Sequence, residues 1–170
     1  MALSNIANTY MALGQTEQAF YYFDRSLELA GQTDDKFTRV YALLSAARSC
    51  YELADYQTAR LHLYQGLALA EESKQKGFQF ECHELLANLY KKEGDFEKAL
   101  AIFFPLLSEA EIYMDTLNMG GIMNTVGSIA IARGEPAEAL KWIHKAVAFS
   151  VAGPKYFPVL AAVYVNAANA

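Results

Sequence analysis

Cysteine, basic clusters and long apolar runs are scarce in this sequence, and each scarcity excludes a class of protein. Two cysteines, Cys50 and Cys82, occur in 170 residues. Both fall within helical patterns, so we expect small buried thiols rather than a disulfide or redox pair. The 14 Lys and Arg are outnumbered by 19 Asp and Glu, for a formal net charge of -5, and they form no basic run. A surface that follows nucleic-acid phosphates is therefore not expected.

Membrane and export signals are also missing. No apolar run approaches the roughly 20 residues that cross a bilayer. The chain does not begin with a basic segment followed by an apolar one, as a signal peptide would. We therefore expect a cytoplasmic protein that has no membrane partner.

Catalytic and metal-binding patterns are not found either. The three histidines, His62, His83 and His144, fall in unrelated helical positions without the spacing of metal ligands. The sequence contains no glycine-rich phosphate loop and no nucleophile elbow. We predict that the chain is not an enzyme and needs no metal or other cofactor.

What the sequence does contain is enough apolar material to fold and a regular repeat. Hydrophobic residues make up 54% of the chain and charged residues 19%, which is typical of a folded domain rather than a disordered one. Small or helix-breaking residues recur every forty positions, each between two stretches of helical apolar periodicity: Gly14, Ala54, Gly94 and Gly134. This spacing predicts helical hairpins with one turn in each repeat.

Further columns of residues keep the same register. The second helix of each hairpin carries a small and then a large apolar residue, at Ala19 and Phe23, Ala59 and Leu63, Ala99 and Phe103, and Ala139 and Ile143. The first helix has a comparable pair, at Ile6 and Ala7, Ala46 and Ala47, Leu86 and Ala87, and Val126 and Gly127. Small residues at these positions would let the paired helices approach closely.

These columns carry a resemblance to a known family. A small residue followed by Tyr10 or Tyr90, then glycine, then Ala-x-x-x-Phe resembles the tetratricopeptide signature, and it is best matched in the first and third repeats. The unit of forty residues exceeds the usual ~34. In this respect the chain is similar to the long-repeat branch of MalT-type, Pins-type and Rap-type arrays. HEAT-like repeats have a compatible length but lack this Gly, Ala and Phe spacing.

The resemblance implies an all-α fold, a right-handed α-solenoid of antiparallel helical hairpins. We predict nine helices, at 2–13, 16–31, 35–53, 56–73, 76–93, 96–113, 117–133, 136–151 and 156–169. They form a single array of repeats at about 1–33, 34–74, 75–115 and 116–153, with a half repeat at 154–170. These ends suggest a fragment of a longer array, because terminal repeats usually carry polar capping faces. The apolar helix at 156–169 would favour self-association.

A partner is expected on the inner, concave side of the superhelix, which the first helix of each hairpin lines. The predicted partner-binding residues are Ser4, Asn8, Met11, Tyr41, Leu44, Arg48, Tyr51, Glu84, Asn88, Lys91, Asn124 and Ser128. A clamp for a C-terminal carboxylate, as in chaperone-adaptor members of the family, is not predicted. Ser4, Glu81 and Leu85 stand where that clamp would need basic residues.

Two functions follow from the resemblance. The first is a scaffold that binds a protein or peptide in the groove. The alternative is a ligand-sensing or self-assembly module that controls a missing output domain, such as a transcription regulator, a cyclase or a kinase signalling protein. Fold analogy alone supports the alternative.

Overall fold

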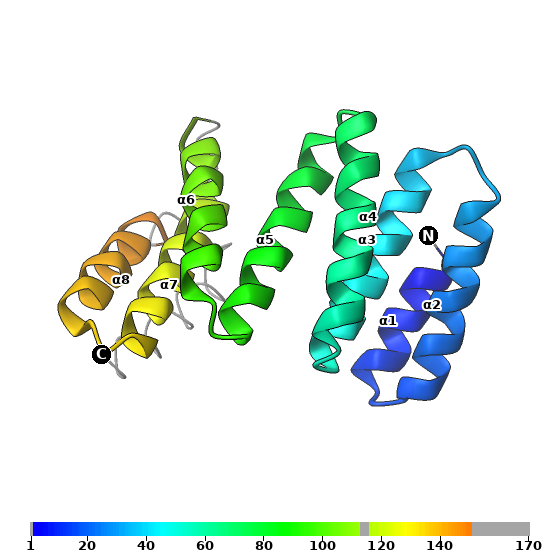
Figure 1. The fold of residues 1–170 in the computed structure, drawn as a ribbon, viewed down its shortest axis with the longest axis horizontal. Coiled ribbons are helices and arrows are strands. Elements are labelled where there is room, and N and C mark those ends of the chain that lie inside the picture. Colours follow the sequence, from blue (N-terminus) through cyan, green and yellow to red (C-terminus); the bar gives the residue numbers. More distant parts are fainter. Residues whose placement is uncertain (1, 113–115, 151–170) are drawn as a thin grey trace. The chain divides into compact units, whose positions relative to one another are not determined.

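The computed structural model describes residues 2–112 and 116–150, and within these ranges the chain forms eight helices and no strands (Figure 1). Their bounds are α1 Ala2–Ala12, α2 Thr16–Gly31, α3 Lys36–Glu52, α4 Tyr56–Glu72, α5 Lys76–Lys92, α6 Phe96–Ile112, α7 Thr116–Ala132 and α8 Pro136–Ser150. The all-α fold is therefore confirmed. The predicted helix at 156–169, and the self-association assigned to it, lie outside the described residues.

The helices divide between two compact units, Met1–Leu89 and Tyr90–Ala170. In the first unit α1 packs on α2, α3 packs on α4, and α2 and α1 both contact α3. In the second unit α6 contacts α7, and α7 packs on α8. The single continuous array at 1–170 stays a prediction.

The forty-residue period is confirmed by the positions of the helices. α3, α5 and α7 begin at residues 36, 76 and 116, and α2, α4, α6 and α8 begin at residues 16, 56, 96 and 136. The predicted bounds of these helices agree with the observed ones to within one residue. The agreement is close because the first helix of each repeat ends in the same C-terminal capping motif.

The capping motif contains a residue in the left-handed conformation within the turn of each hairpin. Gly14, Ala54, Gly94 and Gly134 have φ values of 72°, 61°, 80° and 73°. In the first turn the Gly14 N–H donates to the carbonyl of Met11, and the Gln15 N–H donates to the carbonyl of Tyr10, both at 2.9 Å. The same pair of bonds recurs in the other three turns. This is a Schellman motif, which satisfies carbonyls that the helix end leaves without partners.

Aspartates begin two of the second helices. Asp55 Oδ1 accepts a hydrogen bond from the Thr58 N–H at 3.1 Å, and Asp95 Oδ1 accepts one from the Lys98 N–H at 3.2 Å. Side-chain hydrogen bonds, from Thr58 and from Lys98 respectively, lower the pKa of each carboxyl below its ordinary value. A short polar side chain at this position satisfies an N–H group at the start of the helix.

The core follows the predicted columns. Ala19, Ala59, Ala99 and Ala139 have no exposed surface, and the large residues of the next column, Phe23, Leu63, Phe103 and Ile143, are also buried. The small residues of the first helices are buried as well, at Ala7, Ala47, Ala87 and Gly127. Ile6 is an exception because it is 40% exposed.

The two cysteines are free and buried, as the sequence indicated. Burial raises the pKa of Cys50 to about 11 and that of Cys82 to about 12. Thiols with such pKa values are protonated at neutral pH and weakly nucleophilic. Both act as small core residues.

Candidate functional site

The first helices of successive hairpins are joined by polar and aromatic contacts in the first unit. The Tyr41 hydroxyl in α3 donates to Asn5 Oδ1 in α1 at 2.7 Å. Arg48 Nη2 in α3 lies 2.6 Å from Glu81 Oε2 in α5. The residues between and beside these contacts form what we call the first-helix surface: Asn5, Asn8, Met11, Tyr41, Arg48, Tyr51, Glu81, Glu84 and Asn88.

The predicted partner-binding residues differ in their exposure. Asn8 and Arg48 are exposed, whereas Met11, Tyr41, Tyr51, Glu84 and Asn88 are partly buried. The remaining residues with exposed surface, Lys91, Asn124 and Ser128, are partly buried and belong to the second unit. The predicted residues up to Asn88 lie in the first unit, and we confine the first-helix surface to that unit.

Ser4 and Leu44 are corrections to the prediction. Ser4 has no exposed surface and its Oγ lies 2.7 Å from Ser26 Oγ, while Leu44 is 3% exposed. A side chain without exposure cannot contact a partner on a preformed surface, so both belong to the core. The cause is their register: residues 4, 44, 84 and 124 occupy one column of the repeat, which turns toward neighbouring helices rather than toward solvent.

Glu84 is unusual because it places a carboxyl in that largely buried column. Burial raises the pKa of Glu84 above its ordinary value, Arg48 opposes the rise, and Glu81 adds to it. Within the described part of the chain no hydrogen bond or ion pair reaches the Glu84 carboxyl. A partly desolvated carboxylate attracts a cation more strongly than a solvated one does.

Arg48 does not neutralise Glu84, because its ion pair is made with Glu81. The side chains of Arg48 and Glu81 are 56% and 40% exposed. Such exposed pairs stabilise a fold by less than about 1 kcal/mol. The charges of Arg48 and Glu81 cancel each other, so the net negative charge of these three side chains is that of Glu84.

Two tyrosines contact each other where α3 is followed by α4. Tyr51 near the end of α3 is partly buried, and its ring centroid lies 6.1 Å from that of Tyr56 in α4. Burial raises the pKa of Tyr51, and Glu52 and Tyr56 add to the rise, so its hydroxyl is a neutral donor at physiological pH. Half-buried tyrosines offer apolar area and a polar tip with little side-chain entropy to lose on binding.

Asn5 belongs to the surface although it was not among the predicted site residues. Tyr41 and Asn5 are 36 positions apart, which is the repeat length less one helical turn. The pairs Lys36 with Glu72 and Arg133 with Glu97 have the same separation. Polar pairs at this separation are a signal that a search of the sequence alone could have used.

Family models match both units. Residues 1–72 match a model described as tetratricopeptide repeat, and residues 82–113 match a second model with the same description. The chain belongs to the tetratricopeptide repeat family. Its repeats therefore belong to a class that mediates protein–protein interaction in general. The resemblance to the long-repeat branch in particular stays a prediction.

Solved structures agree with the family. The fold of this tetratricopeptide repeat protein is similar to that of the nearly identical TPR-like repeats assigned to a kinesin light chain of Podosopora anserina. Two such structures, both 14% identical in sequence, match 99% of this chain and 84% and 85% of their own chains, with TM-scores of 0.78 and 0.77. At this identity the likeness concerns the fold alone. No curated protein matches the sequence.

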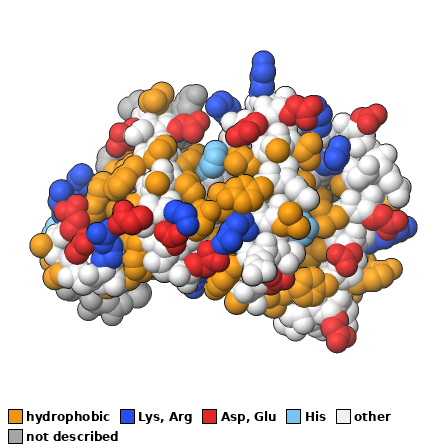
Figure 2. Space-filling view, in the orientation of Figure 1, with side chains coloured by type: hydrophobic (Ala, Val, Ile, Leu, Met, Phe, Trp, Pro, Cys, Tyr) orange, Lys and Arg blue, Asp and Glu red, His pale blue; other side chains and the backbone are white. Residues whose placement is uncertain are grey.

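Other kinds of site were not found in the described part of this repeat protein. Residues 2–112 and 116–150 contain no group of three His, Cys, Asp or Glu side chains placed to hold a metal ion. In the same ranges, no helix combines the length and apolar character needed to cross a membrane. On the face drawn in Figure 2, basic and acidic side chains are interspersed rather than gathered by sign.

Proposed function

We propose that the first-helix surface binds a segment of a partner protein and that a cationic side chain of the partner contacts Glu84. The observation that carries this proposal is the half-buried Glu84 carboxyl, which no hydrogen bond or ion pair reaches among the described residues. A lysine or arginine placed there would offset a desolvation that the folded chain already bears. The concave groove predicted from the sequence is the same set of first helices.

The neighbouring side chains suit an extended or helical segment. Asn8 can both donate and accept hydrogen bonds, and Tyr41 and Tyr51 are partly buried aromatic residues of the same surface. The formal charge of -5 would favour the approach of a basic partner over an acidic one. Binding should therefore weaken as the salt concentration rises.

The first test compares partners captured by the 170-residue chain and by variants that remain helical by circular dichroism. Asn8→Ala and Tyr51→Ala alter the first-helix surface without changing its charge. Gln18→Ala and Tyr21→Ala are matched controls, because both residues are exposed on α2. We expect proteins captured by wild type to be lost with the first pair and retained with the second. Unchanged capture by the first pair would remove the first-helix surface from the proposal.

The second test concerns the cation. Once a captured partner is known, its affinity is measured by calorimetry for wild type, for Glu84→Gln and for the exposed control Glu28→Gln. We expect Glu84→Gln to weaken binding at least about tenfold, which corresponds to 1.4 kcal/mol, and Glu28→Gln to leave it unchanged. Equal affinities for all three proteins would show that Glu84 does not contact a cation of the partner.

A further inference from the structure

A cavity of about 530 Å³ lies among α2, α3 and α4, apart from the first-helix surface. All of its lining residues belong to the first unit. Its apolar wall includes Leu27 of α2, Leu43 of α3 and Leu69 of α4. The volume lies within the range of roughly 300–1,000 Å³ that is typical of small-molecule sites, which are mostly apolar with a few placed polar groups.

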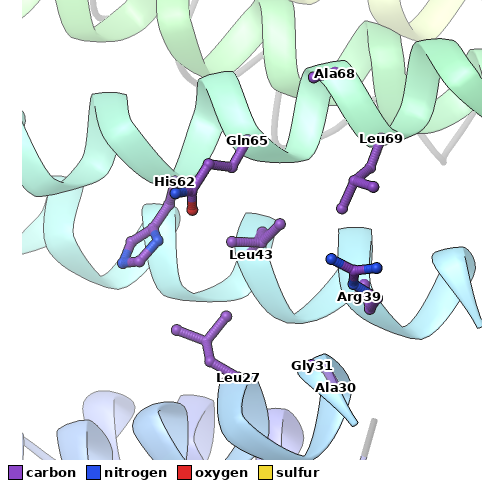
Figure 3. A pocket seen from close by; sticks show the side chains of 9 residues that line it. All are labelled: Leu27, Ala30, Gly31, Arg39, Leu43, His62, Gln65, Ala68 and Leu69. Atoms are coloured by element: carbon purple, nitrogen blue, oxygen red, sulfur yellow. The ribbon is translucent and has the colours of Figure 1, made fainter. Parts of the chain in front are cut away.

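One end of the cavity carries a cation. Figure 3 shows the Arg39 side chain close to Leu69, with Leu43 farther along the cavity. No hydrogen bond or ion pair to the Arg39 guanidinium occurs among the described residues. The nearby Glu72 is paired with Lys36 at 2.6 Å; Lys36 is the main cause of its lowered pKa, and Arg39 adds a smaller effect in the same direction. The positive charge of Arg39 is therefore not taken up by that carboxylate.

The other end carries an unsatisfied nitrogen. His62 and Gln65 lie on the far side of Leu43 from Arg39 (Figure 3). His62 Nδ1 is buried and has no hydrogen-bond partner among the described residues. Burial lowers the pKa of His62 below 6.5, although Gln65, Asp24 and Asp55 oppose this shift. The neutral imidazole can donate one hydrogen bond and accept another. A buried polar atom without a partner is costly, and a ligand that satisfies it gains in affinity.

The separation of the two ends follows from helix geometry. Leu69, beside Arg39, is seven residues after His62 on α4. At 1.5 Å per residue this corresponds to about 10 Å. Three leucine side chains cover the wall between the ends, so the middle of a ligand should be hydrocarbon.

We propose that this cavity binds a small aliphatic carboxylate with a hydroxyl group at its far end. The carboxylate contacts Arg39, the hydrocarbon chain lies against Leu27 and Leu43, and the hydroxyl hydrogen-bonds to His62 Nδ1. An arginine is suited to the carboxylate because its planar guanidinium can donate two parallel hydrogen bonds. The proposal goes beyond protein binding at the first-helix surface, and it fits the ligand-sensing alternative that the sequence left open.

The test is a calorimetric titration of the 170-residue chain with three probes: 8-hydroxyoctanoate, octanoate and octane-1,8-diol. The first carries both proposed polar groups, and each of the others lacks one. We expect saturable binding of 8-hydroxyoctanoate and affinities at least about tenfold weaker for octanoate and the diol. Absence of saturable binding, or an affinity for octanoate or for the diol equal to that for 8-hydroxyoctanoate, would overturn the proposal.

Variants locate the site. Arg39→Gln should reduce the affinity for 8-hydroxyoctanoate to that of the diol, whereas Arg25→Gln, the same change on α2 outside the cavity, should not alter it. Ala68→Phe keeps every charge and fills the cavity from its exposed rim, so it should abolish binding. Circular dichroism confirms that each variant is folded. If Arg39→Gln and Ala68→Phe both bind like wild type, the ligand does not occupy this cavity.

Discussion

Ser4 in α1 and Ser26 in α2 share a hydrogen bond between their hydroxyl groups, 2.7 Å between the two oxygens, inside the first hairpin. Ser4 has no exposed surface and Ser26 is 6% exposed. Each hydroxyl therefore depends on the other for its hydrogen bond. The pair explains how a polar residue occupies a position that the repeat otherwise buries.

Ser4→Ala should destabilise the chain by about 1–3 kcal/mol, because it leaves the Ser26 hydroxyl buried without its partner. The double variant Ser4→Ala, Ser26→Ala should recover most of this loss, since no buried hydroxyl then remains. Urea denaturation of the wild type, both single variants and the double variant measures the coupling. Additive losses in the double variant would show that the two hydroxyl groups act independently.

Ala54→Gly should stabilise the chain by about 1 kcal/mol. Ala54 has a φ of 61°, and the left-handed conformation costs an L-residue with a Cβ about 1–2 kcal/mol, part of which the greater freedom of glycine in the unfolded chain offsets. Gly14→Ala should cost a comparable amount, although its added Cβ would meet nothing within 4 Å. Thermal or chemical denaturation gives the differences.

Gly77→Ala is the control for the effect of φ. Gly77 lies in α5, has no positive φ, and has open space around it. Replacing it with alanine should be neutral or stabilising. Equal losses for Gly14→Ala and Gly77→Ala would mean that the left-handed turn is not the cause.

Gly66→Ala should stabilise the chain by about 0.5–1 kcal/mol, because alanine favours the helix and an added Cβ would lie at an ordinary 3.6 Å from both Cys82 Sγ and Leu43 Cβ. At Gly127 the added Cβ would lie 3.0 Å from Ile143 Cγ1, which is too close for an unadjusted packing. Gly127→Ala should therefore be less favourable than Gly66→Ala by at least about 1 kcal/mol. The free energies of unfolding of both variants, measured by denaturation, test this prediction. Equal changes in the two variants would contradict the close approach of α7 and α8.

Glu84→Gln should raise the stability at pH 7 and leave it unchanged in acid. The folded chain holds the pKa of Glu84 above its ordinary value of 4.5, mainly through burial, so ionisation of this carboxyl opposes folding. Below the unfolded pKa the carboxyl is protonated in both states and the penalty is absent. It grows as the pH rises through 4.5 and is complete above the folded pKa.

The measurement is the difference in unfolding free energy between Glu84→Gln and wild type, from below pH 4.5 up to pH 7. Glu81→Gln is the control, because it removes an exposed carboxylate from the ion pair with Arg48 and should cost less than about 1 kcal/mol at pH 7. A difference for Glu84→Gln that stays constant with pH would mean that its carboxyl is not desolvated in the folded chain.

Much of the fold could be predicted from the sequence because the same pattern of small, apolar and turn residues occurs in all four repeats. Ala19, Ala59, Ala99 and Ala139 mark the close contact of paired helices, and all four have no exposed surface. The site was predicted less well. Ser4 and Leu44 share their column with Glu84, but they are buried whereas Glu84 is only partly buried. A rotation of about a few tens of degrees about the helix axis is enough to move a residue from the surface to the core.

The sequence by itself determined the helices, their forty-residue period and the family, because apolar periodicity and turn residues act within one hairpin. Only the tertiary structure decided which side chains meet between hairpins. It paired Tyr41 with Asn5 and Arg48 with Glu81, and it left Glu84 and Arg39 without ion pairs among the described residues. Such contacts depend on how neighbouring helices rotate and slide against each other, which packing across the whole unit sets and no local pattern records.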